Sequence, residues 1–247
     1  MDRDYFSKYY TLERNHWWFI VRAEIIIDTI KSKIAINEPL SILNIGSATG
    51  RTSEILQEFG DVISVEYDKE SVESSKNILK TPVINGSIND LPFPNEKFDL
   101  VCAFDVIEHV SDDENAISEM YRVCKPSGSL FVTVPAFQSL WSAHDEINHH
   151  FRRYRKADLL KLFSENSGSI QRVTYFNSIL FVPVFILRKI QVIFSSKKAG
   201  AEKSDFESIK SPFINKIFYL IFSLERWMIK KISFPFGVSI LLLWKKQ

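Results

Sequence analysis

Short apolar runs alternate with amphipathic stretches over most of this chain. Runs of this length and composition predict buried strands, and they lie at 42–45, 61–66, 81–85, 98–104 and 129–134. Segments with helical periodicity separate them, for example 51–59 and 111–124. Strands and helices in alternation predict an α/β fold with a doubly wound, Rossmann-like, mostly parallel sheet, because crossover connections are right-handed.

Both ends of the chain carry further elements. Residues 4–36 are helical in pattern, a helix follows at 156–166, and two more strands are predicted at 169–176 and 238–244. We expect one domain of 247 residues in four parts: an N-terminal helical lid at 1–38, the core sheet and helices at 39–177, a helical insertion at 178–233, and the final strand at 234–247.

The insertion contains two apolar helical stretches separated by a polar linker at 195–211, whose composition predicts mobility. Its second stretch combines an apolar stripe with cations: Phe213, Ile217, Leu220, Leu224, Trp227 and Met228 beside Lys216, Arg226, Lys230 and Lys231. Such a helix suits peripheral contact with a membrane, a lid packed on the domain, or a dimer seam, and packing is the commonest outcome. The longest uncharged run, 173–187, is too short to predict a transmembrane helix.

The candidate ligand site begins at the turn after the first strand. The turn reads Gly-Ser-Ala-Thr-Gly at 46–50, and glycine lets a ligand lie against the main chain. Ligands bind at this carboxyl edge of an open α/β sheet. A dinucleotide fingerprint needs a third glycine where Arg51 stands, and a phosphate loop needs a Gly-Lys-Ser/Thr ending, so both kinds of phosphate site are disfavoured.

Four segments share their residues and order with a known enzyme family. They are the turn at 44–50, the carboxylate Glu66 ending the second run, Leu-Pro-Phe at 91–93 with Phe-Asp-Leu-Val at 98–101, and Phe-Asp-Val-Ile-Glu-His-Val at 104–110. The chain thereby resembles class I S-adenosylmethionine-dependent methyltransferases with a type 11/12-like methyltransferase domain. The resemblance implies a seven-stranded sheet whose last strand lies antiparallel beside the fifth. It also implies S-adenosylmethionine as the cofactor and S-adenosylhomocysteine as the product.

The same resemblance implies which residues bind the cofactor. They are Asn44, Gly46, Ser47, Gly50, Glu66, Tyr67, Ser87, Ile88 and Phe104. The Glu66 carboxylate would accept hydrogen bonds from both ribose hydroxyls. Two positions depart from the family pattern, since Asn44 replaces aspartate and Ala48 replaces glycine. Alanine fits best where φ is negative, so we expect a negative φ at Ala48 and weaker cofactor binding than is usual.

The catalytic candidates follow the fourth and fifth strands. His109 has the pKa range of a general base, and Glu108 would orient it. His144, in the long loop after the fifth strand, is a competing base. The alternative role for the Glu-His pair is to organise the cleft without transferring a proton.

The loop at 140–155 is rich in histidine and arginine, and loops of this length are usually functional. The substrate-binding candidates are His149, Arg152 and Arg153 in the loop and Trp18 in the lid. The two arginines would clamp an anionic group by paired bonds, or else tie the loop to Asp145 and Glu146. The alternative for Trp18 is to pack its helix on the sheet.

Metal binding is a further alternative for this loop. His144, Asp145, His149 and His150 are all metal-ligand types. No closed four-ligand spacing appears among them, and methyl transfer in most enzymes of this fold needs no metal. We therefore expect no metal ion.

Composition limits the partners and the compartment. A net charge of +1 disfavours general nucleic-acid binding. Cys102 and Cys124 lie in apolar patterns, which indicates buried thiols in a reducing compartment. The first residues lack the order of a secretory signal, so a cytoplasmic location is expected, with peripheral membrane contact through 178–233 as a hypothesis.

The predicted function is methyl transfer from S-adenosylmethionine to a small-molecule or a lipid- or sugar-linked acceptor, at O or N, by in-line displacement. The alternatives are a catalytically weak protein that binds the cofactor or a partner, and a nucleotide-sugar or dinucleotide enzyme on a similar sheet. The sequence leaves the acceptor and the oligomeric state open.

Overall fold

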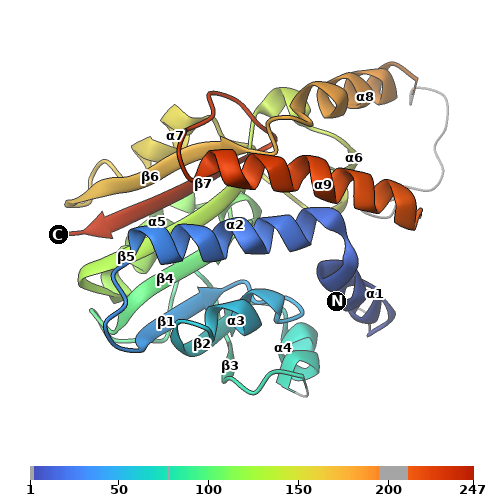
Figure 1. The fold of residues 1–247 in the computed structure, drawn as a ribbon. Helices are drawn as coiled ribbons and strands as arrows, with labels where there is room; N and C mark the ends of the chain where they lie inside the picture. Colours follow the sequence, from blue (N-terminus) through green and yellow to red (C-terminus); the bar gives the residue numbers. More distant parts are fainter. Residues whose placement is uncertain (1–2, 77, 195–210) are drawn as a thin grey trace.

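Seven strands form one mixed sheet with helices on both faces, in a computed structural model that describes residues 3–76, 78–194 and 211–247 (Figure 1). The strands are β1 Leu40–Ile45, β2 Gly60–Glu66, β3 Val83–Asn85, β4 Phe98–Phe104, β5 Cys124–Pro135, β6 Gly168–Phe176 and β7 Ser239–Lys246. Their order in the sheet is β3-β2-β1-β4-β5-β7-β6. The first five pair in parallel, and β7 lies antiparallel between β5 and β6. This confirms the predicted sheet, including the place of its last strand.

The helices occupy the connections between these strands. They are α1 Arg3–Asn15, α2 Trp17–Lys33, α3 Arg51–Leu56, α4 Lys69–Lys76, α5 Asp113–Val123, α6 Ala143–Ile147, α7 Lys156–Lys161, α8 Phe181–Phe194 and α9 Pro212–Ile229, with short 3₁₀ turns η1 Ile107–His109 and η2 Gln138–Leu140. The single helical stretch expected at 4–36 is wrong in one respect. It breaks at His16, whose extended backbone lets its ring accept a hydrogen bond from the Trp18 N–H at 3.3 Å and so cap α2.

The sheet has a separate hydrophobic core on each face, because successive strand side chains point to opposite sides. Ile42 and Leu241 belong to the core beneath α2, α3 and α9. Their neighbours Leu43 and Leu242 belong to the core beneath α5 and α7. The two free cysteines are buried, as expected. A sheet covered on both faces leaves its carboxyl edge as the place where a ligand can approach.

The insertion supplies α8 and α9, while the expected linker at 195–211 lies outside the described residues except for Ser211. Helix α9 runs beside α2 (Figure 1), and Arg226 on α9 pairs with Asp28 at 2.5 Å and Glu24 at 2.9 Å on α2. The buried face of α9 includes Phe222 and Ile229.

The apolar stripe predicted on α9 points outward. Its exposed fractions run from 39% at Ile217 to 74% at Trp227. The stripe is therefore not packed on the domain, because the helix packs on α2 through its opposite side, and contact with a membrane or a second copy stays a hypothesis. Within the described ranges, no helix combines the length and apolarity needed to cross a membrane.

Candidate functional site

The turn between β1 and α3 brings main chain to the edge of the sheet. Gly46 and Gly50 have φ angles of 71° and 88°, a conformation that favours glycine. A Cβ on Gly46 would collide with Val106, and one on Gly50 would collide with Leu79. Ala48 has a φ of 47°, so the expectation of a negative φ there is wrong. The turn requires this left-handed conformation at Ala48, and alanine adopts it at a conformational free-energy cost that glycine would avoid.

Glu66 lies where β2 ends beside this turn. Its Oε2 accepts a hydrogen bond from the Ala48 N–H at 2.9 Å, and its Oε1 accepts one from the Asp68 N–H at 3.1 Å. Parallel pairing of β1 with β2 places the two strand ends side by side, which is why residues so distant in sequence meet. Each carboxylate oxygen keeps a lone pair for a ligand after these bonds.

A cavity of about 920 Å³ opens at this edge. Small-molecule sites have volumes of about 300–1,000 Å³, so a nucleoside-sized cofactor and a second ligand fit together. Of the expected cofactor residues, the wall includes Gly46, Glu66, Tyr67, Ser87, Ile88 and Phe104. Of the expected catalytic and substrate residues, it includes Glu108, His109, His144, Trp18 and Arg153.

Five expected site residues lie outside the described wall of this cavity: Asn44, Ser47, Gly50, His149 and Arg152. Asn44 is fully buried, and its amide donates to the hydroxyls of Thr52 and Ser53 at 2.9 Å each. Asn44 therefore fixes β1 to α3 behind the turn. Arg152 pairs with Asp113 at 2.7 Å instead of facing the cavity.

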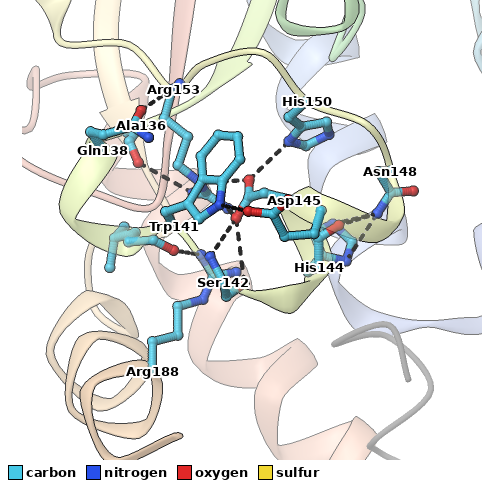
Figure 2. A network of polar contacts seen from close by, with 12 residues as sticks. Ala136, Gln138, Trp141, Ser142, His144, Asp145, Asn148, His150, Arg153 and Arg188 are labelled. Carbon is cyan, nitrogen blue, oxygen red and sulfur yellow. Dashed lines mark hydrogen bonds and ion pairs between the residues drawn. The ribbon is translucent and has the colours of Figure 1, made fainter. Parts of the chain in front are cut away.

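The long loop is built around the buried carboxylate of Asp145 (Figure 2). Arg153 donates to it through Nε at 2.7 Å and Nη2 at 3.0 Å, and the Ser142 N–H donates at 2.8 Å. His150 Nδ1 lies 2.8 Å from Oδ1 of the same carboxylate. These donors lower the pKa of Asp145 far below its usual value, against the opposing effect of burial. The sequence left two roles open for Arg153, to clamp an anionic group or to tie the loop to Asp145, and the structure shows the bond to Asp145.

Glu108 and His109 both line the cavity. Burial, followed by repulsion from Asp105, raises the pKa of Glu108 well above its usual value, and smaller effects of its own amide, Arg22 and Arg153 oppose this. Burial against the cavity wall, together with His150, lowers the pKa of His109 to about 4. Within the described residues, neither Glu108 oxygen has a hydrogen-bond partner, so the expected orientation of His109 by Glu108 is absent.

The cavity wall contains an ion pair that the sequence did not reveal. Arg22 of α2 lies 2.5 Å from the carboxylate of Asp105, and its guanidinium stands 5.7 Å from the centre of the Phe104 ring. Asp105 lies inside the segment 104–110, which carries the resemblance to methyltransferases, so the sequence could have indicated Asp105 as a site residue. Arg22 gave no such signal, because its helix is far from β4 in the sequence.

Comparison with known proteins finds a family model that matches part of this chain. Residues 43–132 match the family model described as "Methyltransferase domain". Over this stretch the chain is similar to a methyltransferase domain. The domain implies S-adenosylmethionine as its cofactor, and the Gly46 approach, the Glu66 carboxylate and the apolar Ile88 wall fit that molecule.

Curated relatives are similar to this chain over part of its length. "Ubiquinone/menaquinone biosynthesis C-methyltransferase UbiE" of Erwinia tasmaniensis is 30% identical over 115 residues, which cover 42% of this chain and 46% of that protein. "Probable S-adenosylmethionine-dependent methyltransferase" of Mycolicibacterium smegmatis is 27% identical over 160 residues, covering 63% and 60%. The chain thus spans about half the length of these curated relatives.

Solved structures share the fold of the methyltransferase domain over most of the chain. A SAM-dependent methyltransferase from Archaeoglobus fulgidus superposes with a TM-score of 0.56 at 15% identity and covers 91% of this chain and 94% of its own. The cyclase SpnF superposes with a TM-score of 0.57 at 15% identity, covering 90% and 79%. At this identity the likeness concerns the fold alone, and it includes a protein named for another reaction.

Proposed function

We propose that this protein transfers a methyl group from S-adenosylmethionine to a small-molecule or lipid-linked acceptor, at oxygen or nitrogen. The observation that carries the proposal is Glu66, whose carboxylate is fixed by the Ala48 N–H at 2.9 Å on the wall of a cavity of about 920 Å³. A carboxylate held at this strand end suits a ribose diol, because two hydroxyls can donate to its two oxygens.

The cofactor, when bound, supplies a methyl group made electrophilic by a sulfonium. Gly46 would lie against its methionine part, Glu66 would hold the ribose, and Ile88 would pack on the adenine. Trp18 and Phe104 supply apolar wall on the lid and sheet sides. These residues align the reactants and exclude water, which is the main requirement of an in-line displacement whose charge disperses.

A hydroxyl or amine acceptor loses a proton during the transfer. His109 and His144 both line the cavity. A pKa of about 4 keeps His109 neutral at pH 7 but makes it a weak base, because a general base works best with a pKa near the working pH. His144 is the competing base, since it lines the same cavity.

The helical insertion favours an amphipathic acceptor. Leu180, just before α8, and Pro183 and Val184 on α8 line the cavity, and the helix exposes Val182 and Ile186. Helix α9 exposes a second set of apolar side chains, the stripe from Phe213 to Met228. A lipid-linked acceptor whose chain stays in a membrane surface would reach the cavity past α8. We propose peripheral membrane contact on this ground, with a dimer seam as the competing outcome.

Calorimetric titration of the full chain tests the proposal. We expect S-adenosylhomocysteine to bind with one site per chain and NAD not to bind. Incubation with methyl-labelled cofactor and a lipid extract should then label an acceptor. Binding of NAD alone would overturn the proposal, whereas cofactor binding with no labelled product from any acceptor pool would identify a binding protein without catalysis.

A further inference from the structure

One buried polar group in the cavity wall is left without a partner. Glu108 is fully buried, and within the described part of the chain neither of its carboxylate oxygens has a hydrogen bond. Buried carboxylates without partners are strongly unfavourable, so such a group in a native fold indicates that something else satisfies it. The cavity wall is where that partner would reach it.

Two imidazoles face this carboxylate. One potential ligand atom from each of Glu108, His109 and His150 lies within 4.8 Å of the other two. The rings of His109 and His150 stand edge to face with centroids 4.5 Å apart. We propose that Glu108, His109 and His150 bind a divalent transition-metal ion of the zinc class at the wall of the cavity.

The donor set and spacing fit this kind of ion. Donors around zinc at about 2.1 Å in tetrahedral geometry lie about 3.4 Å apart, so these three need to approach one another by at most about 1.4 Å. Rotation of side-chain torsions covers that difference. Two imidazoles with one carboxylate are typical of zinc sites that keep a position open for a further ligand, here on the cavity side.

The surroundings of His150 support metal ligation. Its Nδ1 lies 2.8 Å from the Asp145 carboxylate, which makes Nδ1 the donor and leaves Nε2 for a metal. Arg153 holds the same carboxylate with two bonds, so the imidazole is fixed in direction (Figure 2). The Phe151 N–H donates to the Glu108 carbonyl oxygen at 2.8 Å and joins the loop to η1.

This inference departs from the expectation of no metal and does not depend on methyl transfer. The loop alone holds no closed ligand spacing, because two of the three ligands lie in η1. Pairing of β4 with β5 brings η1 and the loop to the same edge of the sheet. It also gives His109 a role other than that of a base.

Direct metal titration of the full chain, free of any histidine tag and stripped with a chelator, tests the site. We expect one Zn²⁺ per chain by calorimetry, visible absorption bands on adding Co²⁺, and a higher midpoint of thermal unfolding with Zn²⁺. Glu108→Gln and His150→Ala should each lower the Zn²⁺ affinity by about a hundredfold or more. His149→Ala is the matched control. His149 is an exposed neighbour of His150 and is not among the residues that line the cavity, so this variant should bind Zn²⁺ as the wild type does.

Circular dichroism and S-adenosylhomocysteine titration of each variant establish that it folds. Absence of Zn²⁺ and Co²⁺ binding by the wild type would overturn the inference, as would unchanged affinity in either ligand variant. Loss of binding in His149→Ala would also overturn it, because the wrong histidine would then be the ligand. Zn²⁺ binding without S-adenosylhomocysteine binding would leave the metal site standing and remove the proposed methyl transfer.

Discussion

The cavity has two halves that are built in different ways. The cofactor half consists of Gly46 and Ala48 in the turn, the carboxylate of Glu66 and apolar walls at strand ends. The loop half is formed by charged side chains that bond one another, with Asp145 and Arg153 at the centre. In the first half, sheet pairing fixes main-chain positions. In the second, a buried ion pair must form before any site exists.

This difference predicts that the two halves respond differently to substitution. Charge loss in the cofactor half should remove binding and leave the fold intact, because strand pairing still places the turn. Charge loss in the loop half should first cost stability, because it leaves a partner buried and uncompensated.

The largest expected effect comes from Asp145→Asn. Arg153 is 8% exposed, and removing its carboxylate partner leaves a buried charge, which costs about 3–5 kcal/mol of unfolding free energy. Urea unfolding followed by circular dichroism measures this. Glu146→Gln is the control, since Glu146 is exposed and the substitution should change stability by no more than about 0.5 kcal/mol. A cost below about 1 kcal/mol for Asp145→Asn would show that the loop does not depend on this pair.

Glu66→Gln should have the next largest effect, on binding rather than on folding. Hydrogen bonds to charged groups are worth about 1.5–3 kcal/mol each, so loss of the charge should weaken S-adenosylhomocysteine binding roughly a hundredfold. Titration calorimetry measures the affinity, and thermal unfolding should change little. Asp61→Asn, at the exposed start of β2, should bind normally. Unchanged affinity in Glu66→Gln would remove Glu66 from the cofactor site.

The same contrast explains how much the sequence could predict. The sheet, the turn and Glu66 were predictable, because each depends on short apolar runs and on residues at strand ends. The Asp145–Arg153 pair was foreseen only as one of two alternatives, because sequence neighbours do not show which charges will be buried. The Arg22–Asp105 pair and the meeting of His109 with His150 were not predictable, since each joins separate segments through the packing of the sheet.

Helix α1 adds a pH-dependent contact to the cofactor half. The Thr49 hydroxyl in the turn donates to Glu13, and burial raises the pKa of Glu13 to about 7 from an ordinary value of 4.5. The folded state therefore holds this proton more tightly than the unfolded chain. The stability that protonated Glu13 contributes is complete below pH 4.5 and is lost as the pH rises to 7.

We expect the wild type to lose about 2 kcal/mol more stability than Glu13→Gln between pH 5 and pH 7. Urea unfolding of both proteins across this range measures the difference, and all other groups cancel. Asp145 behaves oppositely, because its lowered pKa means that its contribution is lost only in acid. Parallel curves for the two proteins from pH 5 to pH 7 would show that Glu13 titrates normally.

The smallest expected effect concerns the exposed stripe of α9. Arg226 and Lys230 are paired with Asp28, whereas Lys216 is exposed near the start of the helix. One lysine near an anionic membrane contributes about 1 kcal/mol, so Lys216→Gln should weaken binding to anionic vesicles about fivefold at low salt. Vesicle flotation measures this, and Lys161→Gln on α7, across the sheet, should bind normally. If the wild type does not float with the vesicles and sediments as a dimer, the stripe is a subunit interface and the acceptor need not be lipid-linked.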